Sequence, residues 1–302
     1  MVTKERLTAQ DFDQELLDIY DYYVHGKIDR RTFLDRAAKY AVGGLTALAL
    51  LEMLSPNYAL AAQVPKEDAR VKSEFLKYPS PAGNATNGEM RGLFARPAAA
   101  QGKLPGVIVV HENRGLNPYV EDVARRLAVA GFVAFAPDAL WALGGYPGTD
   151  DEGRTMQAKL DRNKITEDFV AATKFLQSHP DCNGKLGVVG FCFGGGMAHT
   201  LAVRMPDVIK AAAPYYGGPP PAEDAAKVKG ALLIHLGELD TGINNRMPAY
   251  EAALKAANVE FTTHIYPKAN HGFHNDTTPR FDEAAAKLSW DRTLEFFKNK
   301  LG

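Results

Sequence analysis

The stretch that decides the fold is Leu186-Gly187-Val188-Val189-Gly190-Phe191-Cys192-Phe193-Gly194. Its first four residues form the short apolar run of a buried strand, and residues 195–204 are predicted to form a helix. Between them, residues 190–194 have the form Gly-x-nucleophile-x-Gly, which suits a sharp turn from strand to helix. Glycines fit this turn because the strand and the helix pack closely around a strained central residue. We therefore expect the Cys192 sulfur at a helix N-terminus, where the helix dipole and free N–H groups favour a thiolate.

Strands and helices alternate over the chain from Leu104 onward. Buried strands are predicted at residues 107–110, 132–135, 186–189, 209–214, 231–236 and 261–266, with amphipathic helices at 117–130, 166–178, 195–204, 247–257 and 282–297. This alternation is typical of an α/β protein with a mostly parallel sheet and helices on both faces. We predict such a domain over residues 63–302, preceded by an N-terminal extension over residues 1–62. Functional residues should lie in loops after strands, where ligands of such sheets bind.

Composition excludes several classes of protein. The chain has 302 residues, 46% of them apolar, which is enough to bury a sizeable core. Lys plus Arg number 35 and Asp plus Glu 36, so no strong positive field attracts nucleic acid, and we predict no nucleic-acid partner. The two cysteines, Cys182 and Cys192, cannot build a disulfide framework. Cys182 lies in turn sequence before a strand and is interpreted as structural.

Two polar residues follow strands at the places that nucleophilic catalysis requires. Asp240 comes just after the strand at 231–236, and His271 comes after the strand at 261–266. Nucleophile, acid and histidine thus occur in the chain order of α/β-hydrolases, which predicts that fold and a triad of Cys192, Asp240 and His271. Glu238 is an alternative for the acid, and His274 is an alternative for the base.

These segments resemble the dienelactone hydrolase (carboxymethylenebutenolidase) family, and the resemblance extends from about Lys72 to the C-terminus. The matching segments are residues 190–196, 237–240 and 270–273. The resemblance implies an enzyme that cleaves a small-molecule ester or lactone with Cys, Asp and His, and we predict no metal and no cofactor. It also implies that Glu112, after the strand at 107–110, interacts with the Cys192 thiol until substrate binds. The alternative for Glu112 is a loop carboxylate paired with Arg114.

In the expected mechanism the Cys192 thiolate attacks the carbonyl and forms a thioester, which water activated by His271 then hydrolyses. Backbone N–H groups of Asn113 and Phe193 are our candidates for the oxyanion hole. We also predict a substrate pocket lined by aromatic side chains, with ordinary packing as the alternative. These residues are Trp141, Tyr146, Tyr215 and Phe273, together with Tyr216. Family members that act on dienelactone hold its carboxylate with arginines, but residues 139–145 and 274–276 contain none. Dienelactone itself is therefore not predicted as the substrate.

Three other functions compete with this one. A general carboxylesterase or thioesterase would use the same triad and differ only in its pocket. A non-catalytic redox sensor would use Cys192 as a thiol of low pKa. A metal-dependent hydrolase would draw ligands from His111, Glu112, His271, His274 and Asp276, which lack the compact spacing of a helix-borne metal motif.

The N-terminal extension resembles a twin-arginine export signal. Residues 30–34 read Arg-Arg-Thr-Phe-Leu, a moderately apolar run covers residues 41–51, and small residues at 59–61 offer a cleavage site. These features predict a periplasmic enzyme. The alternative is a cytoplasmic enzyme with a retained helical extension, because Phe12, Leu16, Leu17 and Tyr20 recur at helical spacing. The apolar run is interrupted at Glu52 and too short to predict a stable membrane span.

Overall fold

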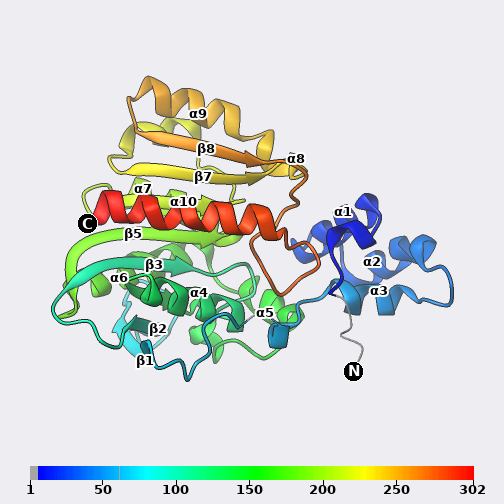
Figure 1. The fold of residues 1–302 in the computed structure, drawn as a ribbon, viewed down its shortest axis with the longest axis horizontal. Coiled ribbons are helices and arrows are strands. Elements are labelled where there is room, and N and C mark those ends of the chain that lie inside the picture. Colours follow the sequence, from blue (N-terminus) through cyan, green and yellow to red (C-terminus); the bar gives the residue numbers. More distant parts are fainter. Residues whose placement is uncertain (1–5, 61) are drawn as a thin grey trace.

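The structure is a computed structural model that describes residues 6–60 and 62–302. Its centre is an eight-stranded sheet with the strand order β1-β2-β4-β3-β5-β6-β7-β8 (Figure 1). The strands are β1 (Val71–Pro79), β2 (Glu89–Pro97), β3 (Leu104–Val110), β4 (Val133–Pro137), β5 (Cys182–Phe191), β6 (Ile209–Tyr215), β7 (Ala231–Gly237) and β8 (Phe261–Tyr266). β2 pairs antiparallel with β1 and β4, and all other neighbours are parallel. The predicted α/β-hydrolase fold, with a mostly parallel sheet, is confirmed.

Helices cover both faces of the sheet. α4 (Pro118–Val129) and α10 (Glu283–Leu301) pack on one face, and α6 (Arg162–Ser178), α7 (Phe193–Arg204) and α9 (Met247–Ala256) pack on the other. β3 shows why both faces are apolar. Ile108 and Val110 join the core on the α6 side, whereas Val107 and Val109 join the core on the α4 side. Because side chains alternate along a strand, a strand buried on both faces is a continuous apolar run.

Three further helices form a separate body at the N-terminus. They are α1 (Gln14–Val24), α2 (Arg30–Ala37) and α3 (Ala47–Leu54), which we call the N-terminal helical unit. It has a hydrophobic core of its own, built around residues such as Leu17, Tyr20 and Phe33. Figure 1 shows this unit on the side of the sheet where β7 and β8 end, as their arrowheads indicate. The unit therefore lies next to the loops in which functional residues were predicted.

The paired arginines and the apolar run of the extension both form helix. Arg30 begins α2 behind the N-cap Asp29, whose side chain accepts a hydrogen bond from the Thr32 backbone. Part of the apolar run forms α3. None of the helices within residues 6–60 and 62–302 has the length and apolar character needed to cross a bilayer. Export through the twin-arginine signal stays a prediction.

Short helices complete the domain, and several of them border the site described below. They are α5 (Asp150–Gln157) and α8 (Thr241–Asn244), with the 3-10 helices η1 (Ala9–Asp11), η2 (Ala38–Tyr40), η3 (Tyr58–Leu60), η4 (Ala139–Leu143) and η5 (Ala222–Lys227). α5 and α8 each follow an N-cap whose side chain accepts a backbone hydrogen bond, Thr149 for α5 and Asp240 for α8. This capping fixes where each loop turns into helix.

Candidate active site

Cys192 occupies the sharp turn between β5 and α7. Its backbone has φ 56° and ψ −113°, a conformation that side chains rarely adopt. The flanking glycines are required by space. A Cβ atom at Gly190 would lie 2.0 Å from the Gly194 carbonyl oxygen, and one at Gly194 would lie 2.2 Å from the Val110 carbonyl oxygen. The predicted strand, turn and helix are therefore present, and the turn leaves the Cys192 side chain 8% exposed at the end of the sheet.

Asp240 and His271 meet beside this turn. Asp240 caps α8 just past β7, and its Oδ2 lies 2.6 Å from Nδ1 of His271, in the loop after β8. His271 Nε2 is buried and has no hydrogen-bond partner among the described residues. Burial lowers the pKa of His271, but the negative charges of Asp240, Cys192 and Asp21 outweigh it and raise that pKa well above its usual value. The imidazole is thus oriented by Asp240 and keeps one nitrogen available.

The two alternatives for acid and base lie elsewhere. Glu238 is exposed, and its carboxylate accepts a hydrogen bond from the Lys268 backbone. His274 is buried behind the turn, where its Nδ1 lies 2.7 Å from the Tyr119 hydroxyl and its ring stacks on Phe191. Neither group faces the Cys192 sulfur.

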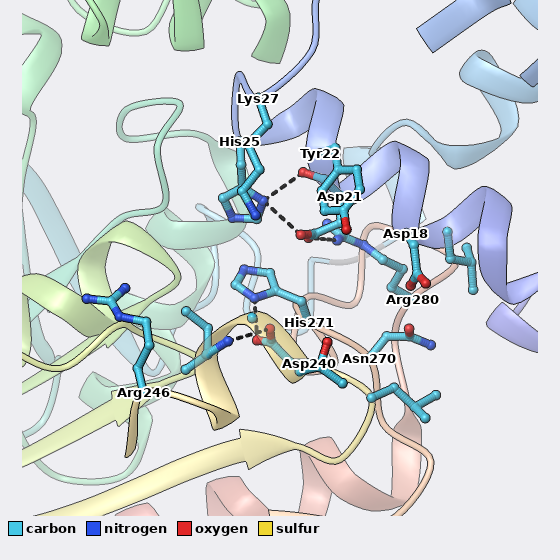
Figure 2. Close-up of a pocket in the computed structure, with 15 residues that line it drawn as sticks. Asp18, Asp21, Tyr22, His25, Lys27, Asp240, Arg246, Asn270, His271 and Arg280 are labelled. Atoms are coloured by element: carbon cyan, nitrogen blue, oxygen red, sulfur yellow. Dashed lines mark hydrogen bonds and ion pairs between the residues drawn. The ribbon is translucent and has the colours of Figure 1, made fainter. Parts of the chain in front are cut away.

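A second histidine reaches the sulfur from the N-terminal helical unit. Nε2 of His25, at the end of α1, lies 3.1 Å from Cys192 Sγ. Its Nδ1 lies 2.8 Å from the Asp21 carbonyl oxygen and 3.2 Å from Asp21 Oδ2. Figure 2 shows His25 and Asp21 facing His271 and Asp240 across the pocket. Ligand atoms of His25, Cys192 and His271 lie within 4.8 Å of one another. His25 could not be predicted from sequence, because it is 167 residues from Cys192 and belongs to no motif.

These groups change the ionisation of the thiol. Burial raises the pKa of Cys192, but His25 and His271 outweigh it and lower the pKa to about 6. Burial lowers the pKa of His25, but the Cys192 charge and Asp21 raise it to about 9. Asp21 is partly buried, which raises its pKa, yet His271, His25 and Arg280 together hold that pKa far below its usual value. These shifts favour a thiolate at Cys192 beside protonated imidazoles.

Glu112 is buried near the turn but has other partners. Its Oε2 accepts a hydrogen bond of 3.0 Å from Asn275 Nδ2 and lies 3.8 Å from Arg114 Nε. Within the described part of the chain it makes no hydrogen bond to Cys192, whose sulfur faces His25 instead. The pairing with Arg114, given above as the alternative, is thus the one observed, and the contact with the thiol implied by the family resemblance is absent here.

The two candidates for the oxyanion hole border the same cavity as Cys192. Phe193 is the first residue of α7, where backbone N–H groups have no partner within the helix. Asn113 lies in the loop after β3, and its side chain donates a hydrogen bond of 2.7 Å to the Val24 carbonyl of α1. The structure thus brings both residues to the Cys192 side of the cavity.

The cavity beside Cys192 has a volume of about 860 Å³, and a smaller one of about 330 Å³ shares His25 and His271 with it. Three arginines border the larger cavity, Arg154 from α5, Arg162 from α6 and Arg246 before α9, whereas none of its described lining residues is acidic. These arginines were not predicted, because they come from segments other than those that hold carboxylates in the family.

The aromatic residues predicted to line the pocket are placed differently. Trp141 stacks under Arg91, 4.0 Å from its guanidinium carbon, and the Tyr146 hydroxyl donates to Asp150. Tyr215 and Phe273 are 0% exposed and belong to the core on the α10 side. Of the predicted aromatic set, only Tyr216 is among the described lining residues of the larger cavity. Trp141, Tyr146, Tyr215 and Phe273 instead contact other residues of the domain, as the alternative of ordinary packing predicts.

The five residues considered for a metal site are not gathered together. His111 hydrogen bonds the Glu112 carbonyl and the Ala139 backbone, and His274 hydrogen bonds Tyr119. Asp276 pairs with Arg126 through its Oδ2, at 2.6 Å. The set therefore offers no common centre.

The chain resembles known proteins in two segments. Residues 90–301 match the family described as dienelactone hydrolase, and residues 3–39 match one described as YqhI-like. A candidate hydrolase fragment of Escherichia coli K12, YghX, is 57% identical over 117 residues, 39% of this chain and 97% of that one. A candidate carboxymethylenebutenolidase of Salmonella typhimurium is 33% identical over 69% of this chain and 82% of its own. The crystal structure of a candidate dienelactone hydrolase from Klebsiella pneumoniae is 27% identical, with a TM-score of 0.65 over 75% of this chain and 99% of that one.

Proposed function

The chain belongs to the dienelactone hydrolase family and is a carboxylic ester hydrolase, and we propose that it cleaves its ester or lactone through a thioester on Cys192. The observation that carries this proposal is the His271–Asp240 pair, 2.6 Å between Nδ1 and Oδ2, beside a thiol at a strand-to-helix turn. A buried carboxylate on Nδ1 fixes the imidazole tautomer and stabilises the imidazolium that forms during the reaction.

The proposed reaction has two halves, formation of a thioester on Cys192 and its hydrolysis. The Cys192 thiolate bonds to the carbonyl carbon, and the carbonyl electron pair moves onto oxygen, where the N–H groups of Asn113 and Phe193 would stabilise it. The intermediate collapses to a thioester, and the leaving alkoxide takes a proton from His271 Nε2. In the second half His271 takes a proton from water, the resulting hydroxide attacks the thioester, and the thiolate leaves.

The charge of the larger cavity supports a substrate with an anionic group. Arg162 and Arg246 form no ion pair within the described part of the chain, and no acidic side chain is among the described lining residues. Guanidinium groups bind carboxylates through parallel hydrogen bonds. We therefore propose an ester or lactone that carries a carboxylate, held by arginines at positions other than those of the family. A neutral carboxylic ester or a thioester would use the same triad.

The deciding experiment measures turnover and the acyl-enzyme together. Wild type, Cys192→Ala and Cys192→Ser are incubated with p-nitrophenyl acetate and butyrate, and nitrophenol release and intact protein mass are followed. We expect turnover by wild type, a transient acyl adduct on it, and a loss on the order of 10³-fold or more in Cys192→Ala. Cys182→Ala is the matched control and should keep its activity, because Cys182 is buried in the core away from the site.

Unchanged turnover in Cys192→Ala contradicts the proposed nucleophile. Reaction with peroxide at Cys192 without turnover of these esters, or of an ester that carries a carboxylate, contradicts the thioester mechanism and favours a redox-sensing role of Cys192.

Twin-arginine export remains a second proposal, supported by Arg30, Arg31 and the apolar run after them. Cleavage near residues 59–61 would remove α1 and with it His25, so an exported enzyme that uses His25 must retain the extension. Intact mass of the protein from periplasmic and cytoplasmic fractions decides this. A periplasmic form that lacks these residues supports export with cleavage, and a full-length form confined to the cytoplasm contradicts export.

A further inference from the structure

We propose that His25, the C-cap residue of α1, is a second catalytic histidine, which holds Cys192 as a thiolate through a direct hydrogen bond to its sulfur. This inference rests on the proposed role of Cys192 as the nucleophile. It assigns part of the reaction to the N-terminal helical unit, which lies outside residues 90–301, the segment that matches the hydrolase family.

The hydrogen bonds of His25 fit an imidazolium. Nδ1 faces two acceptors, the Asp21 carbonyl at 2.8 Å and Asp21 Oδ2 at 3.2 Å, so this nitrogen carries a hydrogen. Nε2 lies 3.1 Å from the sulfur, and either atom of this contact can hold the hydrogen. In the proposed thiolate form the sulfur can only accept, so Nε2 then carries a hydrogen as well. The His271 ring lies perpendicular to it, with the centroids 4.6 Å apart.

Hydrogen bonds join helix α1 to the hydrolase domain and position His25. The buried apolar residues of α1 belong to the core of the N-terminal helical unit, and Asp21 accepts a hydrogen bond from Arg280 in addition to its contact with His25. Hydrogen bonds cross between the two bodies at several points: Arg280 Nη1 to Asp21 Oδ1 at 3.0 Å, Asn113 Nδ2 to the Val24 carbonyl at 2.7 Å, Tyr23 hydroxyl to Asp151 Oδ2 at 2.6 Å, and Gln14 Nε2 to Asn270 Oδ1 at 2.7 Å.

Charged groups face His25 from every element around it. The nearest are Asp21 on its own helix, Cys192 at the turn and His271 in the loop after β8. The ionisable groups that share the smaller cavity with it are Asp18, Asp21, Tyr22, Lys27, Asp240, Arg246, His271 and Arg280. Asp21 and the thiolate favour the imidazolium, and His271 opposes it. The pKa of Cys192 at about 6 and that of His25 at about 9 agree with a thiolate–imidazolium pair between those pH values.

The pair assists both halves of the reaction without consuming a proton. In acylation the negative charge moves from sulfur to the carbonyl oxygen, while His25 keeps both hydrogens. In deacylation the C–S bond breaks and its electron pair returns to sulfur, where the Nε2 hydrogen of His25 stabilises it. A thiolate stabilised in this way is a better leaving group, so His25 assists cleavage of the C–S bond when the thioester is hydrolysed.

The test is the pH dependence of alkylation at Cys192. Full-length protein carrying Cys182→Ala, so that Cys192 is the remaining thiol, reacts with iodoacetamide from pH 4.5 to 10, and intact mass gives the rate. Thiolate reacts and thiol does not, so the midpoint reports the pKa of Cys192. We expect His25→Gln to raise the midpoint by about one pH unit or more, with a roughly tenfold lower rate at pH 6. His264→Gln, a histidine on the edge strand β8, is the matched control and should leave the midpoint unchanged.

Two results overturn the inference. An unchanged curve in His25→Gln means that His25 does not hold the thiolate, and faster alkylation at every pH with an unchanged midpoint means that it only covers the sulfur. Asp21→Asn provides a second, more conservative variant, with a smaller upward shift expected and the exposed Asp35→Asn as its control. Failure of the proposed function is distinct, because it appears as ester turnover by Cys192→Ala whatever the alkylation midpoint.

Discussion

Two carboxylate–histidine pairs flank one sulfur, and they are built in different ways. Asp240 and His271 lie in loops that follow neighbouring strands β7 and β8, so the sheet itself sets their contact of 2.6 Å. Asp21 and His25 are four residues apart on one helix, in a unit with a separate hydrophobic core. The first pair is part of the hydrolase fold, whereas the second reaches the site only because α1 packs against that fold.

The two pairs also differ in whether the imidazole has a ring nitrogen without a partner. His271 is bound through Nδ1 alone, and its Nε2 has no hydrogen-bond partner among the described residues. His25 uses both nitrogens, one on Asp21 and one on the sulfur. A base must have a nitrogen free to exchange a proton, while a fixed positive charge needs none. We therefore assign proton transfer to His271 and charge stabilisation to His25.

The largest difference between the pairs should appear in ester turnover. We expect His271→Gln to lower kcat/KM for p-nitrophenyl acetate on the order of 10³-fold or more, because proton transfer to the leaving group is lost. At pH 7, His25→Gln should cost only about two- to threefold, because a midpoint raised by about one unit still leaves a third to a half of the thiol ionised and His271 still acts. Equal losses in the two variants would contradict the division of roles.

A smaller effect should appear in stability as a function of pH. The pKa of Cys192 is lowered to about 6. Its contribution to the free energy of unfolding is therefore complete above the ordinary pKa of the thiol and is lost as pH falls through 6. The pKa of His25 is raised to about 9, so its contribution is complete below the ordinary pKa of imidazole and is lost as pH rises through 9. Both groups therefore stabilise the native state between about pH 6 and 9.

Thermal or denaturant unfolding of Cys192→Ser across this range measures that contribution. The variant should be less stable than wild type by on the order of 1–2 kcal/mol near pH 7.5, and the difference should shrink at pH 5 and pH 10. Adding His25→Gln to Cys192→Ser should cost little more at pH 7.5, because both substitutions break the same pair. A difference that is constant from pH 5 to 10 would show that the ion pair does not stabilise the fold.

The part of the site that local rules determine could be predicted from the sequence. The turn around Cys192 is marked by glycines that the close packing of β5, α7 and β3 requires. Asp240 and His271 could be placed because the ends of neighbouring parallel strands meet at one edge of a sheet. Tyr215 and Phe273 could not, because loops and strand ends can turn an aromatic ring either way, and here both rings are buried in the core.

His25 and Glu112 show what local rules leave undetermined. The position of His25 depends on how one folded body docks on another, and helical spacing within α1 predicts only which side of that helix is buried. The direction of the Glu112 carboxylate depends on Asn275 and Arg114, which reach it from other loops. The sequence predicts that an acidic group lies near the turn, but its partners are set by tertiary packing.

The smallest predicted effect concerns Arg246, which borders both cavities. If this arginine binds the anionic group of the substrate, Arg246→Gln should lower kcat/KM about tenfold for the p-nitrophenyl half-ester of glutarate and less than about twofold for p-nitrophenyl butyrate. The first effect should weaken as salt is added, since Arg246 is exposed and its field is screened. Arg204→Gln, at the end of α7 and paired with Glu167, is the matched control. Equal losses for both esters would mean that Arg246 shapes the cavity without recognising charge, and the substrate would then be a neutral ester.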